Sequence, residues 1–431
     1  MIYPQIPRHL FEQNRIKLNN KLQAHSVAII TSNDEMPRNG DQFFPFRQNS
    51  DLFYLTGIYQ EKTTLVLCPG HPNSNMREIL FILKPNKELE TWQGKKLTKA
   101  EAIACSGIET IMWEEEFEKT INEIVFANSI LYLNLPENFK IPAELKTAEW
   151  RLTEKLNSRF PLHKKERLAP ILTILRLNKE PEEINIIRYA SQITGKAFNR
   201  VLKFVKPGIY EYEIEAEITH EFLKSGAMGH AYYPIVASGE NACILHYITN
   251  KSKCNDGDLL LLDFGAEYAN YAADCSRTIP VNGKFTQRQL DIYNATYRVF
   301  QKARALMVKG TSITLIQKQV CKLWEEEHIK LGLYSLEDVR RQDPQEPLYL
   351  RYYMHGISHF LGLDVHDVGN KNTLLEPGMV LTCEPGIYIR EEGLGIRLEN
   401  DILVTHDEPI DLMQHIPVEA GEIEEIMNGK K

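Results

Sequence analysis

The second part of the chain contains the same order of secondary structure twice, and this repeat restricts the fold more than any other feature. In each copy, two helices with apolar residues at three- and four-residue steps come before a group of apolar, β-rich segments. A glycine also stands six positions before an acidic residue in both copies, Gly257 before Asp263 and Gly378 before Glu384. Such a repeat predicts two related halves that share one core. The expected helices begin at Pro181, near residue 212, after Thr286 and near Ile313, and the expected strands cover 258–264, 271–281, 379–390 and 395–405.

The first 170 residues have a different pattern. Short apolar segments with the character of strands alternate with helical stretches, which predicts a small α/β domain. The basic stretch 163–167 and Pro170 mark a boundary. We therefore expect an N-terminal α/β domain at 1–170 and an α+β domain with an internal pseudo-two-fold repeat at 171–431. In the first domain the expected strands cover 26–31, 63–68, 79–83 and 130–135, and the expected helices include 98–106 and 143–157.

Charge and composition exclude several classes of protein. The 431 residues carry a formal charge of -8, whereas a surface that binds nucleic acid is basic. No apolar segment approaches the ~20 residues needed to cross a bilayer, and the N-terminus lacks the pattern of a signal peptide. The seven cysteines stand as singles, which is typical of reduced thiols. We therefore expect a cytoplasmic protein that binds neither nucleic acid nor membrane.

Two acidic residues accompany each group of apolar strands in a matching arrangement. Asp263 ends the segment Leu-Leu-Leu-Leu-Asp, and Asp274 comes eleven residues later. A turn at 267–270 would place these two residues directly opposite each other on one face of a hairpin. The turn signal Glu-Glu-Gly would place Glu384 opposite Glu399 in the same way.

Four carboxylates on apolar strands repel one another, and burial makes the repulsion stronger. Divalent cations would neutralise them, and a site of oxygen ligands with one imidazole suits manganese better than a thiolate-rich zinc site. The alternative is that each acid caps a turn or pairs with a nearby arginine, for example Arg277 or Arg397. Because the same arrangement occurs in both hairpins, we favour the metal site.

Histidines also gather in this part of the chain. His355, His359 and His366 lie within twelve residues among glycines, and His246 lies upstream of Asp263. Imidazoles near a metal pair act as ligands, proton shuttles or hydrogen-bond donors to an oxyanion, and the sequence alone does not distribute these roles. The chain has no P-loop, dinucleotide-binding fingerprint or Gly-x-Ser-x-Gly elbow. A hydroxide held between two metals is therefore the expected nucleophile.

The segments around these residues form a set of motifs. They are 239–247 (Gly-Glu-Asn-Ala-Cys-Ile-Leu-His-Tyr), 262–268, 273–278, 280–285, 354–369, 375–381, 384–388 and 395–399, with a further stretch at 46–57. In these motifs the chain closely resembles the aminopeptidase P (Xaa-Pro aminopeptidase) branch of the pita-bread metallopeptidases, which also includes prolidase and methionine aminopeptidase. The resemblance spans nearly the whole chain and implies a pita-bread (creatinase/aminopeptidase) catalytic domain at 171–431.

The resemblance also implies a dinuclear metal site. Asp263 would bind one ion, Asp274 and Glu399 would bridge both, and His359 and Glu384 would complete the other. Enzymes similar to aminopeptidase P typically use manganese, and they release the N-terminal residue from peptides whose second residue is proline. A metal-bridging hydroxide attacks the scissile carbonyl in this family.

The same resemblance implies roles for further residues. Glu384 takes the position of the general base, and Arg397 would orient the carboxylate of Glu399. His246, His355 and His366 would contact the substrate and stabilise the tetrahedral intermediate. Members of the family are often dimers or tetramers, so we expect a homodimer or homotetramer. Trp92 matches an aromatic residue that related enzymes offer to a neighbouring subunit's site.

Two other functions share this pattern. A prolidase, which cleaves only Xaa-Pro dipeptides, has the same metal ligands, but the motif at 46–57 and the stretch Asn-Gly-Lys-Phe at 282–285 favour aminopeptidase P. A metal-free binding module of the same fold would have lost the ligands, whereas all five ligand positions are filled here. Methionine aminopeptidases generally lack the large N-terminal domain.

Overall fold

The computed structural model describes residues 5–137 and 145–429, apart from the side chain of Leu89. It contains two compact units, Pro4–Arg176 and Leu177–Lys431, which divide six residues beyond the predicted boundary at 170. The helix expected at 143–157 begins outside the described residues, and its described part is α6 (Ala148–Arg159), capped by the side chain of Thr147. The sequence was also examined for a signal peptide at its N-terminus, where residues 1–4 lie outside the described residues. No helix within the described ranges is long and apolar enough to cross a membrane.

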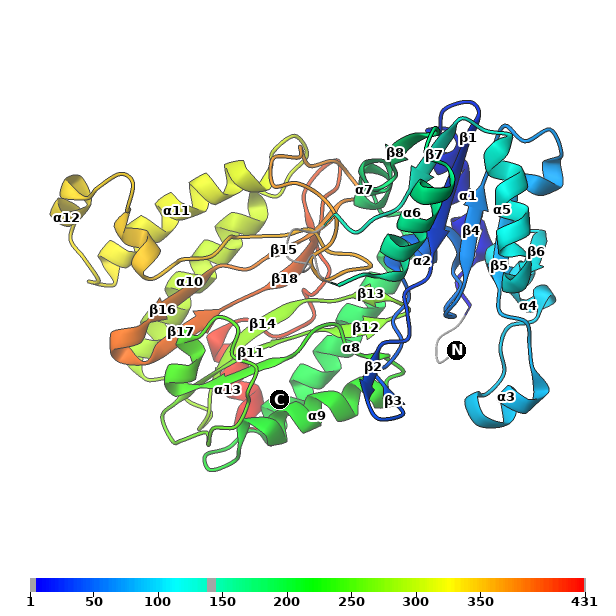
Figure 1. The fold of residues 1–431 in the computed structure, drawn as a ribbon. Helices are drawn as coiled ribbons and strands as arrows, with labels where there is room; N and C mark the ends of the chain where they lie inside the picture. Colours follow the sequence, from blue (N-terminus) through cyan, green and yellow to red (C-terminus); the bar gives the residue numbers. More distant parts are fainter. Residues whose placement is uncertain (1–4, 138–144, 430–431) are drawn as a thin grey trace. The chain divides into compact units, whose positions relative to one another are not determined.

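The unit Pro4–Arg176 contains a six-stranded mixed sheet with helices around it (Figure 1). The central strand β1 (Ser26–Thr31) pairs antiparallel with β4 and parallel with β7. Its residues 26–30 are all buried, as in a strand that is covered on both faces. The predicted α/β domain is therefore confirmed. Across the sheet the strands are β6 (Thr110–Trp113), β5 (Glu78–Ile82), β4 (Thr64–Leu67), β1, β7 (Ile130–Leu133) and β8 (Lys164–Arg167), and the helices are α1 (Arg8–Asn19), α2 (Ser50–Thr56), α3 (Lys87–Gln93), α4 (Lys99–Ser106), α5 (Phe117–Phe126), α6 and α7 (Ala169–Leu177), with a small hairpin of β2 (Pro37–Asn39) and β3 (Gln42–Phe43).

In the unit Leu177–Lys431, the predicted order of two helices and then strands occurs twice. Helices α8 (Pro181–Phe204) and α9 (Glu211–Lys224) precede the first strands, and α10 (Gln287–Ala305) and α11 (Ile313–Lys330) precede the second. Figure 1 shows the strands between the two pairs of helices, and their apolar side chains form one core. The strands are β9 (Gly229–His230), β10 (Ile235–Ser238), β11 (Leu259–Phe264), β12 (Ala266–Tyr268), β13 (Tyr271–Ala272), β14 (Cys275–Pro280), β15 (Val380–Cys383), β16 (Gly386–Ile389), β17 (Leu394–Arg397), β18 (Asn400–Leu403) and β19 (Ile410–Asp411), followed by α13 (Ala420–Met427).

The register of the first hairpin differs from the prediction. Asp263 pairs with Ser276 in the ladder of β11 and β14, so the predicted pairing of Asp263 with Asp274 is wrong by two residues. The reason is the centre of the turn, which lies between Ala269 and Asn270, both with positive φ, whereas the prediction centred the turn on the middle of 267–270, one residue earlier. Because side chains of a strand alternate between its two faces, Asp274 and Ser276, which are two residues apart, point to the same face.

The register of the second hairpin agrees with the prediction. Gly386 pairs with Arg397 in β16 and β17, and Cys383 pairs with Asn400 in β15 and β18. The same register places Glu384 opposite Glu399.

Three of the four strands predicted around the acids, 271–281, 379–390 and 395–405, are each divided into two shorter strands. Asp274 lies between β13 and β14, Glu384 lies between β15 and β16, and Glu399 lies between β17 and β18. At these breaks the chain moves from one sheet to another. The ladders therefore hold the residues on either side, and the acids project from the breaks.

Gly265 makes the corresponding change of sheet possible after β11. A Cβ atom at this position would lie 1.7 Å from the carbonyl oxygen of Ala273. We expect Gly265→Ala to lower the free energy of unfolding by about 2–4 kcal/mol, because the backbone of the hairpin would have to shift. Chemical denaturation followed by circular dichroism measures this loss.

Gly421→Ala is the matched control, since nothing lies within 4 Å of a Cβ atom there and the residue is in α13. Its stability should be unchanged or slightly raised. Equal losses in the two variants would show that the close approach at Gly265 does not constrain the fold.

Candidate metal centre

The breaks in the strands bring three ligand types together. One ligand atom from each of Asp274, His359 and Glu399 lies within 4.8 Å of the other two. The Nε2 atom of His359 is 3.3 Å from Oδ2 of Asp274 and 3.8 Å from Oε1 of Glu384. Four of the five predicted ligands therefore converge around one imidazole.

Asp263, the fifth predicted ligand, is joined to this group by a tyrosine. The hydroxyl of Tyr232 is 2.6 Å from Oδ1 of Asp263 and 2.5 Å from Oδ1 of Asp274. Tyr232 lies in the segment between β9 and β10, where no motif of the sequence marks it, and our sequence reasoning missed it. Its position shows that the carboxylates of Asp263 and Asp274 face the same space, although the two residues do not pair in the ladder.

Arg397 makes its direct contact with Asp263. Its Nη2 donates to Oδ2 of Asp263 at 2.6 Å, and its Nε donates to the hydroxyl of Ser276 at 2.8 Å. That hydroxyl donates in turn to Oε2 of Glu399 at 2.7 Å. The guanidinium of Arg397 therefore reaches Glu399 through Ser276, the ladder partner of Asp263, which sequence reasoning also missed.

Pairing with arginine does not account for the other acids. Arg277 is buried, but it donates to the backbone carbonyl of Glu399 and to neighbouring groups. Among the described residues, no lysine or arginine forms an ion pair with the carboxylates of Asp274, Glu384 or Glu399. The arrangement therefore favours the metal site over the alternative of capped or arginine-paired acids.

Burial and mutual repulsion shift the pKa values in this group. Burial raises the pKa of Glu384 to about 7, although the nearby His359 opposes the shift. Burial and the charges of Asp274 and Glu384 raise the pKa of Glu399 well above its ordinary value. Burial alone would lower the pKa of His359, but the hydrogen bond that His359 donates to Asp274 and the charge of Glu384 raise it to about 9. Oxygen donors with one imidazole, crowded and short of positive charge, fit divalent cations.

The remaining histidines surround the same group. The Nδ1 atom of His355 is 3.8 Å from Oε2 of Glu384, and the ring centroid of His366 is 4.3 Å from that of His359. Burial, and after it the charge of Arg397, lower the pKa of His355 to about 4. His246 is exposed and lies close enough to His355 to contribute to the same shift. All the predicted site residues of this unit thus lie in one region of it.

A hydrogen-bonded chain orients His355. Its Nδ1 is 2.8 Å from the carbonyl oxygen of Gly356, which can only accept, so Nδ1 carries the proton. Its Nε2 therefore accepts from the hydroxyl of Tyr388 at 2.9 Å, and Nη1 of Arg397 donates to that hydroxyl at 2.8 Å. Arg397 thus holds both Asp263 and the orientation of a neutral His355.

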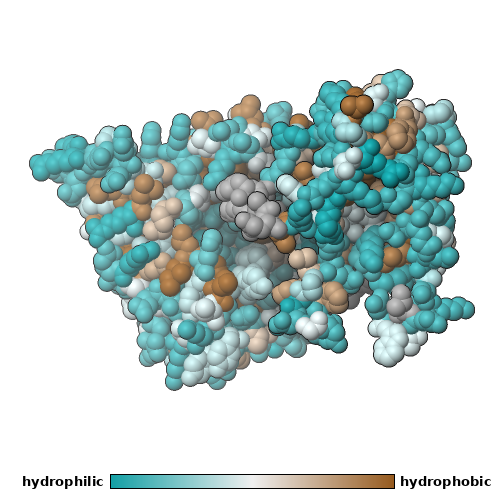
Figure 2. Space-filling view, in the orientation of Figure 1, coloured by the Kyte–Doolittle hydropathy of each residue, from teal (hydrophilic) through white to brown (hydrophobic). Residues whose placement is uncertain are grey.

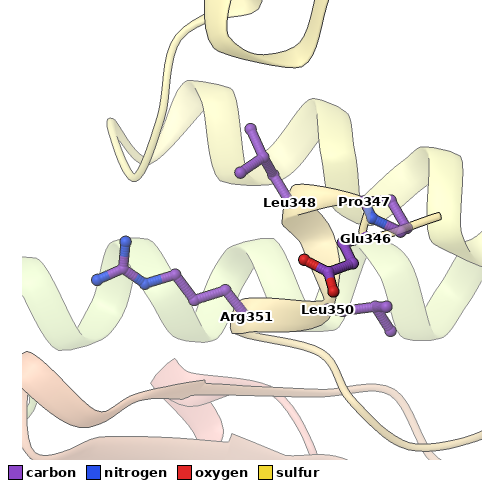
Figure 3. A pocket seen from close by; sticks show the side chains of 5 residues that line it. All are labelled: Glu346, Pro347, Leu348, Leu350 and Arg351. Carbon is purple, nitrogen blue, oxygen red and sulfur yellow. The ribbon is translucent and has the colours of Figure 1, made fainter. Parts of the chain in front are cut away.

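A pocket at 346–351 and the predicted aromatic residue Trp92 both belong to other parts of the chain than the group of acids and histidines. The pocket, of about 350 Å³, lies in the segment before His355 and is lined by Glu346, Pro347, Leu348, Leu350 and Arg351, so none of the predicted ligands lines it. Figure 3 shows these five side chains. Trp92 lies in α3 with 86% of its surface exposed, so it is not part of the core of its unit. A contact of Trp92 with a second copy of the chain remains a prediction.

Comparison with known proteins gives consistent matches over both units. Residues 185–406 match the family model described as "Metallopeptidase family M24", and residues 11–132 match "Aminopeptidase P, N-terminal domain". The chain is 36% identical to the Xaa-Pro aminopeptidase of Escherichia coli (strain K12) over 98% of each chain, and 29% identical to the Xaa-Pro dipeptidase of Mus musculus over 99% of this chain and 94% of that one. A solved structure of zinc-substituted Escherichia coli aminopeptidase P in complex with product superposes with a TM-score of 0.89, at 34% identity, over 99% of this chain and 100% of that one.

The raised pKa values predict a metal affinity that depends on pH. At neutral pH, His359 and the raised carboxyls hold protons that a metal ion must displace, so binding of Mn²⁺ should release protons and should become tighter from pH 6 to pH 8. Isothermal titration in two buffers with different ionisation enthalpies measures the number of protons released. The same affinity and no proton release across this range would contradict the predicted ligand set.

Proposed function

The chain belongs to metallopeptidase family M24 and carries the N-terminal domain of aminopeptidase P, and from this premise we propose that it releases the N-terminal residue of peptides whose second residue is proline. It is a metal-dependent aminopeptidase with the fold of aminopeptidase P, which is the pita-bread fold expected from the motifs. The observation that carries the proposal is the convergence of Asp274, Glu399, His359 and Glu384 on one space. The near full-length similarity to an Xaa-Pro aminopeptidase supports the substrate class.

We propose that five residues hold two divalent ions, which we expect to be manganese. Asp263 would bind one ion, Asp274 and Glu399 both, and His359 and Glu384 the other. The proximity of the ligand atoms and the shared contact of Tyr232 with Asp263 and Asp274 support this set. When bound, the ions would supply a bridging hydroxide as nucleophile and polarise the scissile carbonyl.

The chain's own residues then move the proton and hold the substrate. The family resemblance gives Glu384 the position of the general base, and its carboxylate lies 3.8 Å from both Nε2 of His359 and Nδ1 of His355, within the group that would move protons. The neutral His355 is fixed by Tyr388, and with the nearby His246 and His366 it would contact the substrate and stabilise the tetrahedral intermediate. Arg397 holds Asp263 directly and Glu399 through Ser276.

The substrate class is tested by comparing a dipeptide with a longer peptide. We expect the manganese-loaded protein to cleave Ala-Pro-Ala after alanine, and we expect activity to disappear with a chelator and to return with Mn²⁺. Cleavage of Gly-Pro alone would identify the rival function, a prolidase. A protein that binds no manganese, cobalt or zinc and is indifferent to chelator would instead be a binding module.

Replacing the general base gives a second prediction. Glu384→Gln keeps the size of the side chain but removes the proton acceptor and one negative charge of the metal site, so we expect kcat to fall at least ~100-fold. Circular dichroism should show an unchanged fold. A kcat near that of the wild type, measured with metal bound, would refute the role of Glu384.

The remaining expectations concern the setting of the enzyme. Its cytoplasmic location, its assembly as a homodimer or homotetramer and the absence of nucleic-acid and membrane partners remain predictions from the sequence.

A further inference from the structure

Glu211, the first residue of α9, is a fully buried carboxylate that none of the motifs includes. Among the described residues, no lysine or arginine pairs with it, and all its hydrogen-bond donors are neutral. Five donors reach its two oxygens: to Oε1, the backbone N–H of Ser238 at 2.8 Å, the hydroxyl of Ser238 at 2.8 Å and the side-chain amide of Asn241 at 3.1 Å, and to Oε2, the hydroxyl of Tyr247 at 2.7 Å and the backbone N–H of Ser252 at 2.8 Å.

These donors belong to one loop, residues 239–251, and to the residues that flank it. Ser238 ends β10 immediately before the loop, Ser252 follows it, and Tyr247 lies within it next to His246. The backbone N–H of Glu211 also donates to the carbonyl of Ser252 at 3.0 Å. The side chain of Glu211 therefore connects both ends of the loop to the start of α9, and it also holds Tyr247, the residue next to His246.

The chemistry of the carboxylate suits this task. An ionised carboxylate is an acceptor at about four lone-pair positions, and hydrogen bonds to it are stronger than those between neutral groups. The dipole at the start of α9 stabilises its negative charge. A glutamine in the same place would turn an NH₂ group toward donors, so the set of contacts requires a carboxylate.

The loop 239–251 also contacts residues that support the candidate metal centre. Tyr247 packs in one buried cluster with Tyr388, the residue that orients His355. The backbone of the loop also lies close against β17, because a Cβ atom on Gly395 would be 2.3 Å from the carbonyl oxygen of Ala242. Around the loop, Ile244 and Ile248 are each 54% exposed, and Figure 2 shows hydrophobic residues gathered over the region of β11, β14 and β17.

We propose that Glu211 is a positioning residue for His246: it clamps the loop 239–251 so that the imidazole is held at the active site. The inference rests on the proposed function, in which His246 contacts the substrate. Glu211 itself donates to and accepts from none of the proposed metal ligands. Loss of the clamp therefore acts through the loop, and chiefly through the His246 that the loop carries.

A double-mutant cycle tests this coupling. In manganese-loaded protein acting on Ala-Pro-Ala, His246→Ala should lower kcat without loss of metal. Tyr247→Phe, which removes one donor to Glu211, should lower kcat/KM by about 2- to 10-fold, and Glu211→Gln by more. In the His246→Ala background, each of these changes should cost less than about twofold, because the residue that the clamp positions is absent. Equal losses in both backgrounds would overturn the proposal.

Two further measurements keep the result interpretable. Tyr293→Phe is the matched control, because Tyr293 is buried and its hydroxyl donates to the carbonyl of Val418 at 2.8 Å, away from the loop; its kcat/KM should equal that of the wild type.

Hydrogen exchange should be faster for residues 239–251 in Glu211→Gln, or in Tyr247→Phe if the glutamine variant does not fold, while β11 is unchanged. Unaltered exchange in the loop would refute the clamp. A wild type that does not cleave the peptide would refute the proposed function instead, and the exchange result would still decide on the clamp.

Discussion

The repulsion among the buried carboxylates of Asp274, Glu384 and Glu399 is the constraint on which the rest of the second unit depends. Each carboxylate loses the solvation that would stabilise its charge, and each raises the pKa of its neighbours. A fold that gathers such groups is stable only if protons or cations compensate the charge. Arg397 compensates Asp263, and His359 compensates part of the remainder. In the proposed function, divalent ions complete the balance, and the same ions would supply the peptidase chemistry.

Bringing these carboxylates together requires breaks in the strands. In an unbroken ladder, acids on opposite strands would point to the same face but would stay at fixed positions within one sheet. Breaks at Asp274, Glu384 and Glu399 let the chain leave one sheet and join another, so that carboxylates from both halves of the repeat meet. The two halves are not identical at this point. The position opposite Asp263 holds Ser276, whereas the position opposite Glu384 holds Glu399, and the serine hydroxyl donates to that glutamate.

The support around the centre consists mainly of hydrogen bonds between groups far apart in the sequence. The chain from Arg397 through Tyr388 fixes the tautomer of His355, and the carboxylate of Glu211 holds the loop that carries His246. Both devices use a buried charged group with several hydrogen-bond partners, which makes the local structure rigid. The exposed histidines can then contact a substrate from positions that the buried residues determine.

Much of this protein can be read from its sequence, because the information is local. Periodicity and helix caps predicted the two domains and the repeated order of helices and strands. The turn signal Glu-Glu-Gly in 391–393 predicted the register of the second hairpin, since Gly393 takes the left-handed conformation that such a turn requires. The register predicted for the first hairpin was wrong by two residues, because Ala269 and Asn270 adopt positive φ and the sequence has no glycine there to indicate it. The spacing of acids and histidines predicted a group of residues that the fold brings together.

Tertiary structure alone decided which groups surround those residues. Tyr232 and Glu211 belong to no motif, and Ser276 lies within the motif 273–278 without being singled out there. The importance of these residues comes from contacts over long distances in the chain, such as the 123 positions that separate Ser276 from Glu399. The pKa values also follow from the packing of all neighbours. The sequence determined the kind of elements and the kind of ligands, because propensity and ligand chemistry are properties of single residues and short patterns. Geometry, charge balance and support depend on how the two halves pack together, and only the folded chain contains that information.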